Sequence, residues 1–356
     1  MAKAAREWST VLECARHAHA VARSHGNADF EALGCAFEGL ALTQVGEVAA
    51  SMRLLDEAMA STLGGDLGPM ATGIIFCRWS AHPSTSGTSV APTSGPRLFG
   101  ASRRPRTCRL TGDCRTHRAA VLIRSGAWAE GVLAAERACE ETATFDLTHL
   151  GLAFSELAEI RLRLSDLDAA EGALLRAREF GGTGVEPCLT LLRLACGDVT
   201  GAAVGIEAAL AAASDRLQRA RLLPAKVEAS LVAGNPEAAA AAAAELEGTA
   251  ASYGSPTLLV AARHAMGSVA LATGDREQAV AHLAAAQQFW YEAHAPYERA
   301  HACTLLAGAR LGVGDHESSL VEHRAAYATF TRLGAQPAAA ASAKRLHAFA
   351  CLQEGA

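Results

Sequence analysis

Residues 234–278 read GNPEAAAAAAAELEGTAASYGSPTLLVAARHAMGSVALATGDREQ, and this stretch decides the fold class. Gly234 can adopt the left-handed conformation that ends one helix. Asn235-Pro236 suits the start of the next helix, because an Asn side chain accepts hydrogen bonds from free amides and proline fits the first helical position. Ser255-Pro256 begins a second helix in the same way before the next turn at Gly274. The stretch therefore predicts two antiparallel helices within one period of about 40 residues.

The same period recurs along the chain. Asp275 and Gln278 have the spacing of a capping box at one of its turns. Prolines recur at a nearly constant distance after the turns. Each period therefore contains two helix breaks, one at the turn and one at the proline, and so two helices. The turns are Gly126-Ala127, Ser165-Asp166, Gly197-Asp198, Gly234-Asn235, Gly274-Asp275 and Gly314-Asp315, and the phased prolines are Pro187, Pro256, Pro296 and Pro337.

Apolar residues within the periods follow helical spacing, as at Leu259, Ala262 and Met266. One helix pair cannot bury both of its faces, whereas successive pairs stacked on one another can. We therefore predict an all-α fold, an α-solenoid of tetratricopeptide-like helix pairs. An ordinary alanine-rich bundle is the alternative, and the phased prolines favour the solenoid.

Composition excludes several classes of protein. Half of the residues are hydrophobic, 19% are charged, and nearly a quarter are alanine, which argues against both a disordered chain and a sheet protein. The net charge of −5 gives no basic excess for nucleic acid. The chain lacks both a signal peptide and an uninterrupted apolar span, so we expect a cytoplasmic protein without a membrane segment. The ten cysteines include no CxxC pair and are expected to be reduced.

The segment 79–108 interrupts the repeat. It contains no Asp or Glu, is rich in Ser, Pro, Thr and Arg, and lacks helical periodicity. At face value it is a disordered basic loop in the place of a helical unit. We therefore divide the chain into N-terminal helical repeats (1–78), this irregular segment, tetratricopeptide-like repeats (109–350) and a tail (351–356).

A second explanation of this segment is out-of-frame translation. Back-translation shifted by one base allows Arg78 through Leu98 to read VVSASQHVGDFRRAYEWTEAV. That string is amphipathic and places a Gly-Asp turn at index 86, midway between Gly46 and Gly126. We hypothesise a pair of compensating frameshifts here. A broken repeat also predicts proteolytic loss of the first repeats, while residues 110–350 alone stay soluble.

Several segments resemble the helical-repeat region of large actinobacterial LuxR-type transcriptional regulators. They are Leu54-Leu55-Asp56-Glu57-Ala58-Met59, Gly73-Ile74-Ile75-Phe76-Cys77, Gly112-Asp113-Cys114-Arg115-Thr116-His117-Arg118-Ala119, Gly126-Ala127-Trp128 and Ala325-Ala326-Tyr327 with Leu333-Gly334-Ala335. The resemblance covers about residues 10 to 345. It implies the sensor or scaffold portion of such a regulator. No GxxxxGKS/T motif and no helix-turn-helix domain are present, so neither ATPase activity nor DNA binding is implied for any residue.

Motif searches find no catalytic or metal site. HExxH and GxSxG are absent, and His17 and His19 lie on opposed parts of a helix. Cys108, Cys114 and His117 could supply zinc ligands, but packing is the simpler interpretation.

The helix with Glu136, Glu140, Glu141 and Arg137 is interpreted as a solvated face. Gly181-Gly182-Thr183-Gly184 is interpreted as an inter-helix loop. Phe289-Trp290-Tyr291 and Trp128 are either ligand-stacking surfaces or, more simply, fillers of the seam between neighbouring repeats.

The leading functional hypothesis is a non-enzymatic binding or sensor module of a LuxR-type system. We expect its concave face to bind a protein, a peptide or a small effector, and we expect no cofactor, metal or catalytic residue. The alternatives are a stand-alone scaffold and a regulatory fragment acting on an ATPase or cyclase. The sequence identifies neither the ligand nor the residues of the groove.

Overall fold

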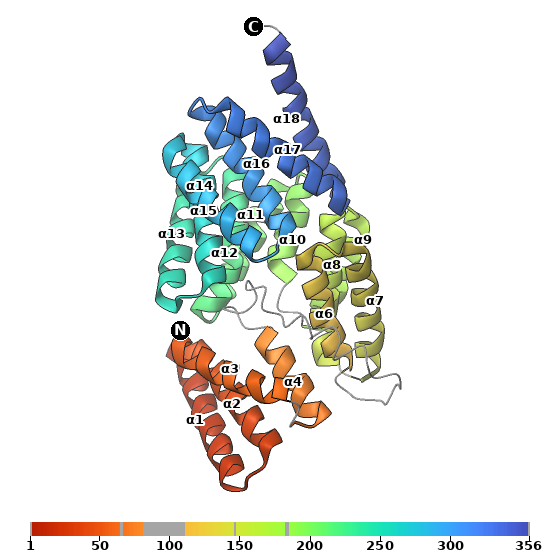
Figure 1. Ribbon diagram of the computed structural model, residues 1–356, viewed down its shortest axis with the longest axis vertical. Coiled ribbons are helices and arrows are strands. Elements are labelled where there is room, and N and C mark those ends of the chain that lie inside the picture. Colours follow the sequence, from red (N-terminus) through yellow and green to blue (C-terminus); the bar gives the residue numbers. More distant parts are fainter. Residues whose placement is uncertain (1, 65–66, 81–110, 146, 182–184, 355–356) are drawn as a thin grey trace.

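The computed structural model describes residues 2–64, 67–80, 111–145, 147–181 and 185–354, and helices are the regular elements in these ranges (Figure 1). The N-terminal part contains α1 (Ala2–Ser24), α2 (Ala28–Val45), α3 (Val48–Gly64) and α4 (Pro69–Ser80). The larger part contains α6 (Thr111–Ser125), α7 (Trp128–Phe145), α8 (Leu147–Arg163), α9 (Leu167–Glu179), α10 (Val185–Ala195), α11 (Val199–Ala212), α12 (Arg216–Val232), α13 (Pro236–Tyr253), α14 (Pro256–Thr273), α15 (Arg276–Glu292), α16 (Pro296–Gly312), α17 (His316–Leu333) and α18 (Gln336–Glu354).

The turns lie where the sequence predicts them. Asn235 Oδ1 accepts from the Ala238 amide at 3.0 Å, and Asp275 Oδ1 accepts from the Gln278 amide at 3.1 Å. Pro256 and Pro296 each occupy the first position of a helix. All six predicted turns have a residue with positive φ at their first position: Gly126, Ser165, Gly197, Gly234, Gly274 and Gly314. The prediction of an all-α solenoid of helix pairs is therefore confirmed.

Alanine allows the helices to approach closely. Ala239, Ala243 and Ala250 of α13 are fully or almost fully buried against α12 and α14. Leu246 lies between them in sequence and is also fully buried. A methyl side chain costs little conformational entropy in a helix and keeps the helix axes close, so the alanine-rich composition suits this stacked array.

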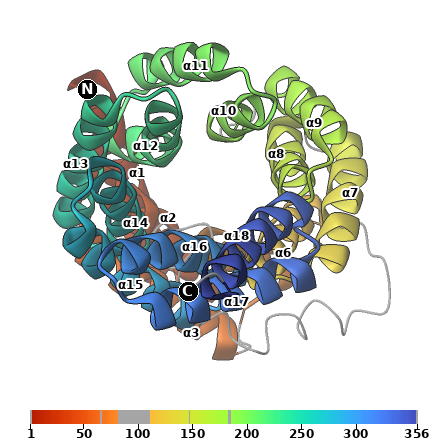
Figure 2. The same cartoon turned by 90° about the horizontal axis from the view of Figure 1, so that it is seen from above.

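The helices form two layers. From α6 to α16, each even-numbered helix contacts the next even-numbered one, whereas the odd-numbered helices in this described part pack mainly on their sequence neighbours. The even-numbered helices therefore converge into an inner layer, and the odd-numbered helices form an outer layer (Figure 2). Because the inner helices lie closer together than the outer helices, the array is curved, and the inner helices form its concave face.

The curved array closes on itself. Viewed from above, α6 to α18 complete a ring in which α16 and α17 return to α6, α7 and α8 (Figure 2). One apolar cluster joins the two ends of this ring. It contains Ile123, Trp128 and Ile160 from the beginning of the ring and Ala300, Cys303, Ala326, Phe330, Leu333, Ala335 and Ala339 from its end.

Two predicted boundaries differ from the structure. Helix α4 continues to Ser80, so Trp79 and Ser80 are helical although we expected irregular chain from residue 79. Helix α18 continues to Glu354, so most of the expected tail 351–356 extends the last helix. Residues 81–108, on which the frameshift hypothesis rests, lie outside the described residues. None of the described helices combines the length and the apolar character needed to cross a membrane.

Candidate functional site

The inner layer carries a group of charged and aromatic side chains, which we call the inner polar cluster. Its members come from four inner helices that lie far apart in sequence. They are Glu156, Glu159 and Arg163 on α8, Glu228 on α12, His264 on α14, and Tyr297, Glu298 and His301 on α16.

Arg163 is the centre of this cluster. Its Nη2 atom donates to Glu159 Oε1 at 2.5 Å and to Glu298 Oε1 at 2.7 Å. The guanidinium also lies 4.5 Å from the centroid of the Tyr297 ring, in a cation–π contact. Burial by itself disfavours the charged form, yet Glu298 and Glu159 together hold the pKa of Arg163 above its ordinary value. Arg163 is therefore a fixed cation within the ring.

Glu228 lies on the inner helix α12. Its side chain is exposed to solvent, yet enough protein surrounds it that burial raises the pKa of its carboxyl group. Glu228 also acts electrostatically on Tyr297, although α12 and α16 are not packed neighbours. Both side chains therefore belong to the same inner face.

Desolvation also shifts the pKa values of the other titratable groups in the cluster. Burial, with a contribution from Glu159, raises the pKa of Glu156 to about 8, so this carboxyl group is largely protonated at neutral pH. Burial lowers the pKa of His264 to about 4 and that of His301 to about 3, so both imidazoles are neutral. Glu156 and Glu228 form no ion pair in the described structure. The inner face thus offers one exposed carboxyl group, that of Glu228, that forms no ion pair within the described residues.

Three atoms of the cluster are buried without a hydrogen bond within the described chain. They are Arg163 Nη1, Glu298 Oε2 and His301 Nε2. His301 instead packs its ring edge-to-face against Tyr297 and Phe330, with centroid distances of 4.6 and 5.1 Å. Buried polar atoms of this kind carry a desolvation cost that the closed structure does not offset.

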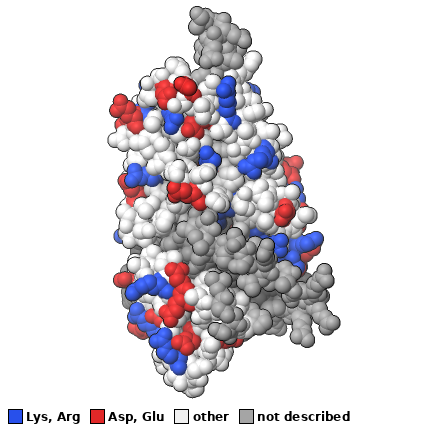
Figure 3. Space-filling view, in the orientation of Figure 1, with Lys and Arg blue, Asp and Glu red and all other residues white. Residues whose placement is uncertain are grey.

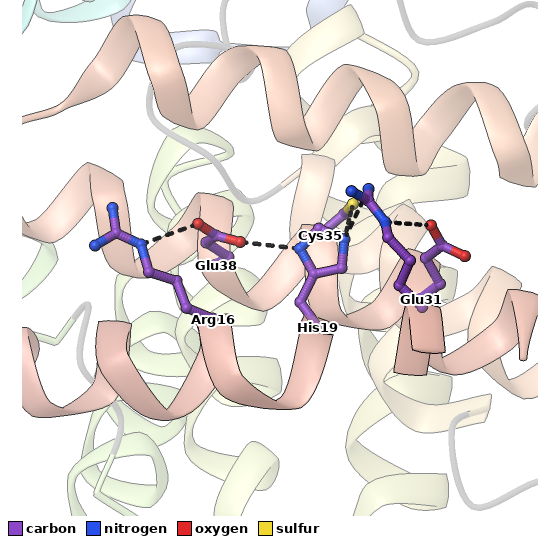
Figure 4. A network of polar contacts seen from close by, with 6 residues as sticks. Arg16, His19, Glu31, Cys35 and Glu38 are labelled. Carbon is purple, nitrogen blue, oxygen red and sulfur yellow. Dashed lines mark hydrogen bonds and ion pairs between the residues drawn. The ribbon is translucent and has the colours of Figure 1, made fainter. Parts of the chain in front are cut away.

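A second polar network lies between α1 and α2 (Figure 4). Cys35 Sγ is 3.2 Å from His19 Nε2, and His19 Nδ1 is 2.9 Å from Glu38 Oε2. The order thiol, imidazole, carboxylate is that of a catalytic relay. However, Cys35 is only 2% exposed, and burial raises the pKa of its thiol to about 11. A protonated, inaccessible thiol is a poor nucleophile, so the geometry favours a packing role.

A close helix crossing explains this second network. A Cβ atom on Gly34 would lie 2.7 Å from His19 Cα, so only glycine allows α1 and α2 to approach this closely. The approach brings His19 between Cys35 and Glu38. Arg16 and Arg23 extend the network, Arg16 Nε to Glu38 Oε1 at 3.1 Å and Arg23 Nε to Glu31 Oε1 at 2.9 Å.

Trp128 lies in the apolar cluster that closes the ring. It is 4% exposed, donates from Nε1 to the Ile123 carbonyl at 2.9 Å, and packs 5.3 Å from Tyr297 across the closure of the ring. It shares one apolar cluster with Ile123 of α6 and Ile160 of α8, and through Tyr297 it also joins the two ends of the array. Tyr291, in contrast, is 58% exposed and lies under Arg299.

The remaining candidates from the sequence are the carboxylates of α7, the possible zinc ligands and the glycine-rich loop. Glu136 pairs with Arg161 and Glu141 with Arg115, each at 2.6 Å, so these carboxylates bind arginines of neighbouring helices rather than of their own. Arg137 and Glu140 of the same helix are exposed, whereas Glu136 and Glu141 are half-buried. Cys108 lies outside the described residues, and the described chain holds no group of three potential metal ligands. Gly181 ends the turn after α9 with a positive φ, whereas residues 182–184 are not described.

Comparison with solved structures supports the fold. The chain is similar to the crystal structure of a Rap protein complexed with Competence and Sporulation Factor, with a TM-score of 0.53 and 11% identity over 90% of this chain and 98% of that chain. A weaker likeness, with a TM-score of 0.37 and 17% identity, relates 66% of this chain to 92% of BtubC (BKLC) from P. vanneervenii. No protein-family model and no curated protein matches the sequence. The chain is thus a tetratricopeptide-like helical-repeat protein by its fold.

Proposed function

We propose that the chain is a binding module whose inner face accepts an extended segment of another protein. The single observation that carries this proposal is the inner polar cluster, in which charged and aromatic side chains from four inner helices interact within the inner layer. Solenoids use concave faces of this kind for recognition. The Rap protein of similar fold was solved in complex with Competence and Sporulation Factor, which supports a binding role.

The charge of the inner face indicates the chemistry of the ligand. Glu228 is exposed and forms no ion pair within the described residues, and the Glu159 side chain, although paired with Arg163, is 44% exposed. A segment that carries Lys or Arg would supply a cation for Glu228. The outer surface in Figure 3 mixes acidic and basic side chains and offers no comparable preference in that view. We therefore expect a basic segment.

A peptide selection tests the proposal. A library of random peptides is panned against the full chain, and the affinity of the best binders is measured by fluorescence polarisation. We expect enrichment of Lys and Arg, and several-fold weaker binding to the Glu228→Gln variant. Glu247→Gln is the matched control, because Glu247 is an exposed carboxylate on the outer helix α13. Selection of acidic peptides, or equal losses in both variants, would contradict the proposal.

We further propose that this module is the sensor portion of a LuxR-type transcriptional regulator. The support is the resemblance of its segments, such as Gly126-Ala127-Trp128, to the repeats of those proteins. The alternatives are a stand-alone scaffold and a fragment that regulates an ATPase or cyclase. Sequencing of the gene beyond both ends separates them, since a regulator requires an in-frame ATPase before residue 1 and a helix-turn-helix after residue 356.

A further inference from the structure

The contact that closes the ring is a specific interface. Trp128, at the start of α7, packs against Tyr297 of α16, and Tyr297 packs in turn on Phe330 of α17 with a centroid distance of 5.8 Å. A Cβ atom on Gly126 would lie 2.8 Å from Leu333 Cδ2 and 2.8 Å from Pro296 Cγ. The turn before α7 therefore fits against the last repeats only because residue 126 is glycine.

This interface differs from the other contacts of the inner layer. Each of the others joins consecutive repeats, whereas the closure joins α8 to α16 through residues 135 positions apart, Arg163 and Glu298. In a solenoid each repeat is stabilised by its nearest neighbours. The closure is an additional contact, so its loss leaves every repeat with the neighbours that stabilise it.

The polar centre of the closure is incompletely satisfied. Arg163 Nη1, Glu298 Oε2 and His301 Nε2 are buried there without a hydrogen bond in the described chain. Separation of α8 from α16 would hydrate these atoms, and this gain opposes the loss of the apolar contacts of Trp128 and Phe330. The free energy of closure is therefore the difference between these two opposing contributions.

We propose that the closure is a releasable clasp, formed by Trp128, Arg163, Tyr297, Glu298, Phe330 and Leu333, that opens and closes the ring while the helix pairs stay folded. The clasp borders the inner polar cluster, because Arg163, Tyr297 and Glu298 belong to both. Its state therefore sets the width of the inner face. The proposal concerns the ligand-free chain and does not depend on what the inner face binds.

Gly126 and Gly274 offer a matched pair of variants. Both have a left-handed backbone, with φ values of 84° and 87°, so alanine imposes the same backbone strain at either position. At Gly126 the added methyl group also meets Leu333 and Pro296, whereas nothing lies within 4 Å of a Cβ atom at Gly274. Of the two variants, only Gly126→Ala therefore introduces a steric clash into the clasp.

Trp128 is a built-in reporter of the clasp. With Trp8, Trp79 and Trp290 changed to Phe, its fluorescence reports on residue 128 alone. In the full chain, we expect Gly126→Ala to increase acrylamide quenching of Trp128 several-fold and to enlarge the radius of gyration in small-angle X-ray scattering. The helical circular dichroism should stay at the level of Gly274→Ala. Arg163→Met, which removes the cation of the clasp, should change quenching and radius in the same direction.

Two results would overturn the proposal. One is unchanged quenching and an unchanged radius of gyration in both Gly126→Ala and Arg163→Met. The other is a rise in quenching that occurs only together with a loss of helicity greater than that of Gly274→Ala, because the closure would then be part of an indivisible core. Neither result bears on peptide selection by the inner face, so the clasp and the proposed binding role can fail separately.

Discussion

Arg163 Nη2 and Glu298 Oε1 are 2.7 Å apart, although their residues are separated by 135 positions in the chain. The side chains are only 14% and 22% exposed, so water screens this ion pair weakly. Removal of one partner leaves a charge in a largely buried place, which is more costly than the pair itself is favourable. The pair therefore fixes the register in which the end of the array meets its beginning.

The first prediction concerns this pair. Glu298→Gln should lower the free energy of unfolding by about 1–3 kcal/mol, because Arg163 loses a charged partner and keeps only Glu159. Glu179→Gln is the control, since Glu179 pairs with Arg176 at a site where both side chains are more than half exposed, and should cost less than about 1 kcal/mol. Urea denaturation measures both. Equal losses would show that the closure contributes no more than a surface pair.

The second prediction concerns acid stability. Burial holds the pKa of His264 near 4 and that of His301 near 3, against 6.5 for an unperturbed imidazole. The unfolded chain therefore binds more protons between pH 6.5 and about 4, and the free energy of unfolding decreases as the pH falls through this window. His301→Leu should make this decrease smaller. Thermal melts across the window test it, and an unchanged pH profile would contradict the buried neutral state of His301.

The third prediction concerns Glu156, which makes the free energy of unfolding decrease as the pH rises, the opposite of the histidine effect. Glu156 keeps its proton up to a pH of about 8 in the folded chain, whereas the unfolded chain releases it above about 4.5. The folded state is therefore disfavoured progressively as the pH rises through this range. Glu156→Gln should raise the free energy of unfolding at pH 8 and leave it nearly unchanged at pH 5. Glu171→Gln, on the exposed face of the outer helix α9, should show no such pH-dependent gain.

The fourth prediction concerns a turn. Ser165 has a φ of 62°, in the place where the other repeats have a left-handed glycine such as Gly197. A side chain in that conformation costs about 1 kcal/mol, so Ser165→Gly should stabilise the chain by about that amount. Gly197→Ser should destabilise it by a similar amount. Chemical denaturation of both variants checks the pair, and loss of stability in Ser165→Gly would contradict the prediction.

The sequence predicts the local structure of the repeats well, because their signals are local. A glycine that ends a helix and an Asn or Asp that caps the next one act within a few residues, as at Gly234 and Asn235. Periodicity also indicates which helix faces are buried. These signals are sufficient to predict the helix pairs and their stacking.

The closure and the inner polar cluster could not be predicted in this way. Which residues meet across the ring depends on the small rotation between successive repeats, summed over several helix pairs. Nothing local marks Arg163 and Glu298 as partners. Trp128 was expected either to bind a ligand or to fill the seam between neighbours, and neither interpretation predicts its contact with Tyr297, far away in sequence. Gly126 is needed for the closure, but a glycine at this position is equally expected of a turn between two helices, so it does not reveal the closure.

A closed ring also limits how such a protein can evolve. Open solenoids lengthen or shorten by whole helix pairs, since each new pair needs only its neighbours. Here, the deletion or duplication of one pair between α8 and α16 would rotate Phe330 and Tyr297 away from Trp128. The contact therefore constrains the number of repeats between these residues as well as their sequence. Homologous chains that keep a glycine before a tryptophan at this turn should also keep the same number of helix pairs after it.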